Sequence, residues 1–454
     1  MEGLPAEFLN VPYLTKPSSE GAGGSVRPTS VNDKEDISDK WRQLQGADDW
    51  VGLLEPFDSL LRAEIRRYGG FAQATYDAFD FDPFSKYAGS ARYGESSLLE
   101  KVGLGDSGYD VTRYIYATMP LLPDQPRLLR HWLPSVASNP ARWLTPKSLR
   151  ADSWIQDSNW MGFQQRGDPA SRPEGYPRGV AWRGTVEPSE WFNNVKWQLE
   201  PLGSSGNATN VNDGAKVERG FQSIYTAKSG SSTFSKTSAS EQVMAEVRRL
   251  VDKYHGGERK EVVNLTITGH SLGGAIALLN AHEAGAAAVP GLTHVSVVSF
   301  GAPKVGNAAF AAAIAKAGVK VLRVDLVPQV PGLILFPGYE HAGIEKDLDI
   351  RSDPDLKYSW LDFPRFHSLK TYLRLVERQL STRIALSAAR VRLVEDMPSE
   401  DLDEVLRTRE CWYRMVDMGL LQGPPGWVRP ERKPEDMPSP PDGGDVWKWK
   451  FLKD

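Results

Sequence analysis

The residues best suited to chemistry are a serine and its flanking glycines, because Gly269–Gly273 has the pattern G-x-S-x-G. Residues 262–268 before it are near-continuously apolar and β-branched, as in a buried parallel strand. Residues 275–281 after it are good helix formers without proline. A strand–turn–helix lifts a serine hydroxyl above the sheet, so Ser271 is predicted to be the nucleophile of an acyl transfer. The alternative is an ordinary glycine-rich turn.

A histidine late in the chain is the candidate base. A serine hydroxyl is a poor nucleophile near neutral pH, so it needs a positioned base, and the base needs an orienting acid. In α/β-hydrolases these groups follow the order serine, acid, histidine. His367 lies in a predicted loop just before a helix and is predicted to be the general base, with His341 as a substitute. The alternative role for His367 is that of a helix-capping or surface histidine.

Asp325 is the candidate acid. It follows a predicted strand at residues 319–324, and the carboxyl ends of core strands share the rim of the sheet that carries the serine. Asp347, Asp349 and Asp353 are alternatives. The competing interpretation of Asp325 is a solvent-facing aspartate that ends a strand.

Two backbone amides are candidates for an oxyanion hole. The N–H of Leu272 lies at the predicted helix N-terminus and points where an oxyanion would form. Thr185 ends the run Arg183–Thr185 after a short predicted strand, where α/β-hydrolases place the second donor. A simple strand-ending turn is the alternative for this run.

The elements that must position these groups alternate along the chain. Strands are predicted at residues 179–182, 262–268, 295–300 and 319–324, and helices at 240–254, 308–317 and 369–380, the first of them capped by Ser240. Strands that alternate with helices predict an α/β fold with a mostly parallel central sheet.

The rest of the chain is divided by composition. Residues 1–36 are rich in Gly, Ser, Pro and Glu and are predicted to be disordered. Residues 37–130 are predicted to form a helical lead-in packed on the core, and 131–380 the core itself. Residues 381–454 are predicted to be a C-terminal tail, first helical and then rich in Pro and Trp.

Composition excludes several classes of function. The net charge of −4, with Lys and Arg spread along the chain, argues against nucleic acid as the main partner. Cys411 is the only cysteine, so no intrachain disulfide can form, which fits a reducing compartment. No apolar run reaches the length of about 18 residues that a membrane span needs, so any contact with lipid is expected to be peripheral. No cofactor or metal ion is expected.

Several motifs in the same order resemble the class 3 lipases. These are AWRGT at 181–185, GHSLGGA at 269–275, VVSFGAPKVGN at 297–307 and FHSL at 366–369. The segments 41–58, 71–93 and 108–118 are similar to the plastid-type branch of the plant phospholipase A1 enzymes, related to the anther dehiscence lipase. The resemblance implies an α/β-hydrolase fold and places Ser271, Asp325 and His367 on the catalytic triad. It also places Thr185 and Leu272 on the oxyanion hole. The segment before Asp325 is shorter than in the family.

The resulting expectation is a serine acyl-ester hydrolase that acts on membrane lipids through an acyl-enzyme. The resemblance implies a phospholipase A1 that releases the sn-1 fatty acid of phospholipids, with a neutral acylglycerol or galactolipid lipase as the alternative. A reading from a different class is a catalytically weakened lipase-like scaffold or binding protein. The family resemblance implies a chloroplast location. The cytoplasm is the alternative, because the first residues contain no clear transit peptide.

Overall fold

The computed structural model describes residues 40–80, 90–117, 160–165, 177–184, 198–203, 214–228, 234, 236–256, 260–327, 338–349, 367–378, 421–423, 426–428 and 432–437. The predicted disordered segment 1–36, Thr185, Asp353, Cys411 and most of the predicted tail lie outside these residues.

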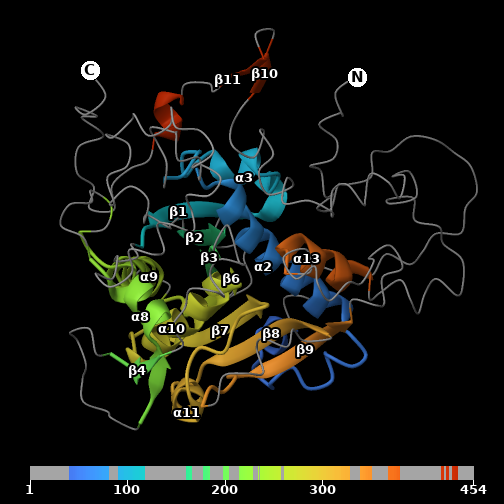
Figure 1. Cartoon of the computed structure of the whole chain (residues 1–454), viewed down its shortest axis with the longest axis vertical. Helices are drawn as coiled ribbons and strands as arrows, with labels where there is room; N and C mark the ends of the chain where they lie inside the picture. The colour runs from blue at the N-terminus through green and yellow to red at the C-terminus, as the bar shows by residue number, and fades with distance from the viewer. Residues whose placement is uncertain are drawn as a thin grey trace, which may run out of the picture.

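A seven-stranded sheet forms the centre of the molecule, in the order β1-β2-β3-β6-β7-β8-β9 (Figure 1). Neighbouring strands from β3 to β9 are parallel, whereas β2 pairs antiparallel with both β1 and β3. The mostly parallel sheet predicted from the sequence is therefore confirmed. The strands are β1 (Tyr109–Ile115), β2 (Trp160–Gln165), β3 (Arg178–Trp182), β6 (Val263–His270), β7 (Leu292–Phe300), β8 (Lys320–Val327) and β9 (Ile344–Asp349).

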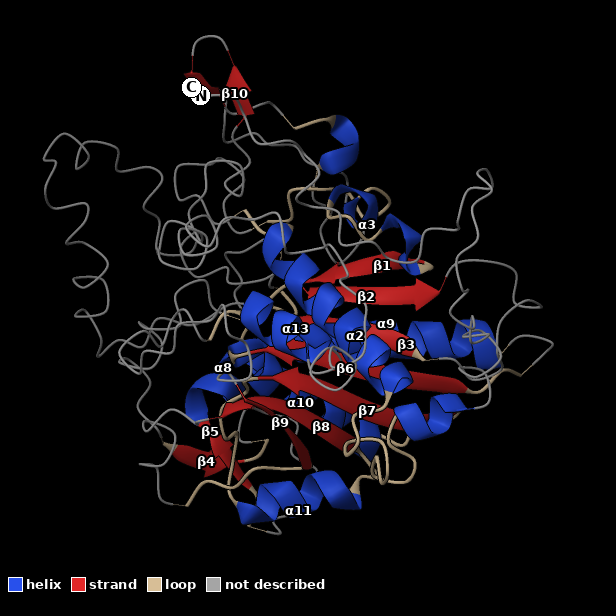
Figure 2. Ribbon diagram, turned by 90° about the vertical axis from the view of Figure 1, so that its right-hand side faces the viewer, coloured by secondary structure: helices blue, strands red, loops and turns tan. Residues whose placement is uncertain are grey.

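Helices cover both faces of the sheet (Figure 2). Strand β7 shows the arrangement, because Val297 packs into one apolar cluster and Phe300 into the other. The Val297 cluster includes side chains of α8 (Arg219–Thr226), α9 (Ala239–His255), α10 (Leu272–Ala286) and α11 (Ala308–Lys316). The Phe300 cluster includes side chains of α2 (Ser59–Asp77), α3 (Leu98–Lys101) and α13 (Leu369–Arg378).

Smaller elements lie outside the central sheet and the two groups of helices that cover its faces. Two-stranded sheets are formed by β4 (Leu199–Pro201) with β5 (Lys216–Glu218) and by β10 (Leu421–Gly423) with β11 (Gly426–Val428). Within the described part of the chain, the 3-10 helices are η2 (Gly105–Ser107) and η8 (Pro434–Asp436). None of the described helices combines the length and apolarity needed to cross a bilayer.

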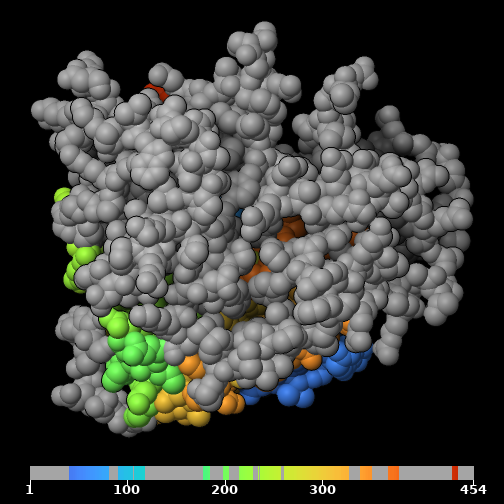
Figure 3. Space-filling model, viewed as in Figure 1, coloured from blue at the N-terminus to red at the C-terminus, as the bar shows by residue number. Residues whose placement is uncertain are grey.

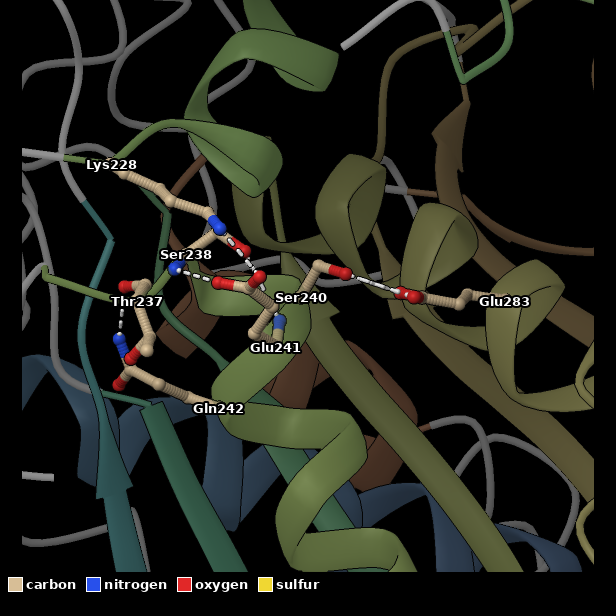
Figure 4. Close-up of polar contacts among 7 residues, drawn as sticks. All are labelled: Lys228, Thr237, Ser238, Ser240, Glu241, Gln242 and Glu283. Atoms are coloured by element: carbon tan, nitrogen blue, oxygen red, sulfur yellow. Dashed lines mark hydrogen bonds and ion pairs between the residues drawn. The ribbon is translucent and has the colours of Figure 1, made fainter. Parts of the chain in front are cut away.

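The N-terminus of α9 is tied to the helix that follows the candidate serine (Figure 4). The helix is capped by Ser238 and not by Ser240, since Ser238 Oγ accepts from the Glu241 N–H and Glu241 accepts from the Ser238 N–H. This capping box satisfies two amides that have no partner inside the helix. Ser240 instead donates to Glu283 of α10, at 2.8 Å to Oε2. The predicted helix is confirmed with its cap two residues earlier.

The central strand β6 is buried along its whole length but apolar on one face only. Leu265 and Ile267 face the cluster that contains α10. On the other face, Thr266 Oγ1 donates to Gln45 Oε1 at 2.6 Å, and Thr268 Oγ1 donates to the Tyr68 carbonyl of α2. Buried hydroxyls cost little when they are hydrogen-bonded, so this polar face holds the N-terminal segment on the sheet.

The predicted lead-in also supplies part of the sheet. In addition to α2 and α3, it contains β1, which is an end strand of the seven-stranded sheet. The boundaries proposed at residues 36, 130 and 380 remain predictions.

Candidate active site

Ser271 lies on a tight turn between β6 and α10. Its backbone has φ 57° and ψ −126°, a conformation that costs a non-glycine residue about 1–3 kcal/mol and is typical of functional sites. A Cβ on Gly269 would come 2.3 Å from the Gly273 carbonyl oxygen, and one on Gly273 would come 2.2 Å from the Trp182 carbonyl oxygen. Both glycines are therefore required by close backbone approach.

The structure brings His367 to the serine. His367 Nε2 lies 2.8 Å from Ser271 Oγ, although 96 residues separate the two in the chain. The histidine is buried just before α13, and Gly301, with φ 53°, leaves the room that its ring and that of Tyr372 occupy. Burial lowers the pKa of His367 to about 4, so the ring is neutral at pH 7 and can accept a proton from the serine.

His341, the predicted substitute, lies in a different environment. Its pKa is lowered to about 3 by burial and by the charges of Arg323 and Lys304. Among the described residues, Ser271 is hydrogen-bonded to His367 and not to His341.

Asp325 lies inside strand β8 and not after it. The strand continues to Val327, with Asp325 in register with Asp347 of β9. Leu322 and Val324 pack with the cluster of α13, so strand alternation directs Asp325 to the other face of the sheet. Strand β8 therefore extends past the end predicted at residue 324, because its pairing with β9 continues to Val327.

The polar partner of Asp325 is an arginine. Arg323 Nη1 donates to Asp325 Oδ2 at 2.6 Å, and Nη2 of the same arginine donates to Glu345. Burial raises the pKa of Asp325 to about 7, against the opposing effect of Arg323. Among the described residues, no hydrogen bond joins Asp325 to His367. Burial is the main cause of the raised pKa of Tyr372, and the charge of the Asp325 carboxylate raises it further; the Tyr372 ring centroid lies 6.4 Å from that of His367.

The other predicted acids are placed as follows. Asp347 is exposed on β9, and Asp349 is the last residue of that strand and half-buried. Asp353 lies outside the described residues.

Sequence reasoning missed His270, whose side chain is hydrogen-bonded to the backbone of the candidate base His367. It is fully buried, and its Nε2 lies 2.7 Å from the backbone carbonyl oxygen of His367, to which it must donate. Burial and the neighbouring His367 hold the pKa of His270 well below 6.5, so Nδ1 is unprotonated and accepts from the Tyr76 hydroxyl at 2.8 Å. The signal available in the sequence was the position of His270 directly before Ser271.

Of the two candidate oxyanion donors, Leu272 lies among the described residues, and Thr185 follows the last described residue of its segment, Gly184. Leu272 is the first residue of α10, where backbone N–H groups lack intrahelical partners. Gly184 precedes Thr185 and lies against the serine turn, since a Cβ on Gly184 would come 2.5 Å from the His270 carbonyl oxygen and 3.2 Å from Ser271 Cβ. Arg183 Nη1 donates to the Gly184 carbonyl oxygen at 2.7 Å.

Comparison with known proteins decides the family. Residues 179–334 match the family model described as Lipase (class 3). The chain is 37% identical to "Phospholipase A1-Igamma1, chloroplastic" of Arabidopsis thaliana over 448 residues, which cover 92% of this chain and 83% of that protein. The chain belongs to the class 3 lipases. Within this family it belongs to the plastid-type branch of the plant phospholipase A1 enzymes, as the sequence motifs predicted.

The chain is also similar to a second protein of A. thaliana and to a lipase of known structure. "Phospholipase A(1) DAD1, chloroplastic" of A. thaliana is 34% identical, over 79% of this chain and 81% of that protein. The solved structure of a lipase from Rhizopus microsporus var. chinensis is 21% identical, over 65% of this chain and 76% of that one, with a TM-score of 0.38. The α/β-hydrolase fold therefore follows from the sheet topology, the serine turn and the family. In the described part of this class 3 lipase, no three His, Cys, Asp or Glu side chains are grouped to hold a metal ion.

Proposed function

We propose that this chain is a serine acyl-ester hydrolase that acts on membrane lipids, most specifically a phospholipase A1. The observation that carries the proposal is the 2.8 Å contact between His367 Nε2 and Ser271 Oγ on the turn before α10. The substrate class is supported by the relatives, which are named phospholipase A1 and share 34–37% identity with most of this chain.

In the proposed reaction, Ser271 Oγ attacks the carbonyl carbon of the sn-1 ester while His367 Nε2 takes the hydroxyl proton. The N–H groups of Leu272 and Thr185 donate hydrogen bonds to the carbonyl oxygen and so stabilise the negative charge that develops on it. The protonated His367 then gives the proton to the departing lysophospholipid oxygen, which leaves an acyl-enzyme. A water molecule, deprotonated by His367, attacks this ester, and the protonated His367 returns the proton to Ser271 Oγ as the fatty acid is released.

Asp325 is proposed as the orienting acid of His367. Its position on the strand next to β7 and its electrostatic effect on Tyr372 support this role. To act in this way, the carboxylate would have to turn away from the face of the sheet to which strand alternation directs it, and exchange its bond to Arg323 for one to His367 Nδ1–H. The location of the enzyme is proposed to be the chloroplast, as in the names of its relatives.

The proposal is tested with a phosphatidylcholine that carries different acyl chains at sn-1 and sn-2. We expect the wild-type chain to release the sn-1 acid first and to be labelled by a serine-directed alkyl phosphonate. Ser271→Ala should lose both the labelling and the hydrolysis. A wild-type chain that is folded but unlabelled would favour the scaffold reading, and turnover by Ser271→Ala near the wild-type rate would remove Ser271 as the nucleophile.

A further inference from the structure

The C-terminal segment Arg432–Met437 lies against residues that precede it by about three quarters of the length of the chain. Asp436 Oδ1 accepts from the Gly94 N–H and from Ser97 Oγ, both at 3.0 Å. The two backbones are in contact, because a Cβ on Gly94 would come 2.0 Å from the Glu435 carbonyl oxygen. The segment contains η8, the short red helix near α3 in Figure 1, and its red atoms are visible at the upper edge in Figure 3.

Arg432 joins two short stretches of the lead-in. Residues 78–80 and 90–92 run antiparallel, with the Asp80 N–H donating to the Ser90 carbonyl oxygen at 3.0 Å. Arg432 Nη2 pairs with Asp80 on the first stretch at 2.7 Å, and the two side chains are only 9% and 8% exposed. Arg432 Nη1 donates to Ser90 Oγ at 3.1 Å and to the Ala91 carbonyl oxygen on the second stretch. One buried guanidinium thus holds both stretches together.

Phe79, on the first stretch, contacts Arg183, the residue that directly follows β3. The Arg183 guanidinium carbon lies 3.8 Å from the centroid of the Phe79 ring, and Arg183 is buried. The same guanidinium donates to the Gly184 carbonyl oxygen. A peptide group is planar and almost always trans, so whatever fixes this carbonyl also fixes the direction of the N–H in the same group. That N–H belongs to Thr185, the proposed second oxyanion donor.

We propose that Arg432 is a remote positioning residue for the oxyanion hole. It holds the two stretches of the lead-in together, keeps Phe79 against Arg183, and through Arg183 sets the orientation of the peptide group after Gly184. This inference rests on the proposed function, because it assigns a role in the stabilisation of the oxyanion.

The test compares Arg432→Gln with Lys433→Gln in the full chain. Lys433 is a matched control, because its side chain is 69% exposed and its ion pair with Glu435, at 3.9 Å, is long and lies at the surface. For a soluble p-nitrophenyl ester, we expect Arg432→Gln to lower kcat by about 10- to 100-fold, because small misplacements of catalytic groups and loss of one oxyanion donor cost factors of about this size or larger. KM should change little, and Lys433→Gln should match the wild type in both constants.

A purely structural role is separated by two further measurements. Arg432→Gln should bind a boronic acid, which forms a tetrahedral adduct with the serine, more weakly by a similar factor, while the acidic limb of its pH profile stays in place. If Arg432→Gln only lowers the melting temperature and keeps kcat within about twofold of the wild type, the inference is overturned. If Arg432→Gln does not fold, Phe79→Leu replaces it, with the same loss of kcat expected and an unchanged kcat again decisive against the inference.

Phosphonate labelling of the wild-type chain separates this inference from the proposed function. A labelled wild type with a fully active Arg432→Gln contradicts only the positioning role. An unlabelled wild type contradicts the hydrolase assignment, and the positioning role with it.

Discussion

The two neighbouring histidines at the serine turn are both buried and both neutral at pH 7, but they are equipped for different tasks. His367 presents Nε2 to Ser271, whereas Nε2 of His270 donates to the His367 backbone. Because its hydrogen bonds occupy both ring nitrogens, His270 cannot exchange protons with the serine. It is suited to holding the backbone that carries the base.

Burial of His367 predicts a specific dependence of stability on pH. Its pKa of about 4 in the folded chain is below the value of about 6.5 expected when unfolded, so the unfolded state binds more protons between these pH values. The histidine therefore lowers the free energy of unfolding progressively as pH falls from about 6.5 to 4, by an amount on the order of 3 kcal/mol in total. Urea unfolding of wild type and His367→Gln at pH 7, 6, 5 and 4.5 measures this difference.

We expect the wild-type chain to lose more stability than His367→Gln over this range. Parallel curves for the two proteins would show that His367 is not buried in its neutral form. In the wild type, the acidic limb of kcat/KM should correspondingly lie below pH 6.5, provided that His367 is the base.

Asp325 allows the sharpest single-residue prediction about the triad. If it orients His367 during catalysis, Asp325→Asn should lower kcat by roughly 10⁴ with little change in fold, as loss of the orienting acid does in other triads. Asp347→Asn is the matched control, because Asp347 pairs with Asp325 in register across β8 and β9 and is exposed. Steady-state kinetics and thermal unfolding of both variants are the measurements.

The opposite pattern would assign Asp325 to the sheet. Arg323 already binds the carboxylate, so a purely structural aspartate would cost stability when replaced and leave kcat nearly unchanged. The acid would then have to come from elsewhere in the chain.

At the scale of elements, the contact between β3 and α10 requires a residue without a side chain at position 273, the second residue of α10. A Cβ on Gly273 would lie 2.2 Å from the Trp182 carbonyl oxygen, and neither backbone can yield easily. We expect Gly273→Ala to lower the free energy of unfolding by about 1–3 kcal/mol or more, in the range for overpacked cores. Chemical denaturation should show almost no effect for Gly105→Ala, where the nearest atom is 3.5 Å away.

The elements with a clear local signal were predictable from the sequence. The strand, turn and helix around Ser271 follow from a β-branched run, two glycines and good helix formers, and the structure has them as β6 and α10. The extension of β8 through Asp325 could not be predicted, because it depends on pairing with β9. The cap of α9 was misplaced by two residues because Ser238 and Ser240 are locally equivalent, and only the contact with Glu283 on another helix separates them.

In the active site, too, local motifs could be predicted from the sequence and contacts between distant residues could not. Ser271 and His367 were proposed from motif and chain order, and the structure places them in contact. The hydrogen bond of Tyr76 to His270 joins residues 194 positions apart, and it exists because α2 crosses the polar face of β6. A single sequence carries no signal for such a crossing.

At the scale of the whole molecule, the predicted lead-in is needed to cover one face of the sheet. Phe300 and Val324 share their apolar cluster with Leu61, Ile65 and Tyr68 of α2, and all are fully or almost fully buried. The lead-in also supplies β1 and holds the serine turn through Tyr76. Removing it would expose apolar strand surface and leave the edge of β2 that faces β1 without a partner strand, so that β2 would pair with β3 alone.

A fragment of residues 131–380, the predicted core alone, should therefore fail to form a stable monomer. We expect it to aggregate or to lack a cooperative thermal transition, whereas residues 37–454 should unfold cooperatively, because this chain keeps α2, β1 and the C-terminal contact with Gly94 and Ser97. Near-UV circular dichroism and size-exclusion chromatography distinguish the two outcomes. Co-expression with residues 37–130 is the informative control: if the lead-in acts by covering the sheet, the separate piece should restore solubility in a stable complex. A core fragment that is monomeric and cooperative by itself would show that the sheet closes without α2 and β1, and would make the lead-in a separate domain.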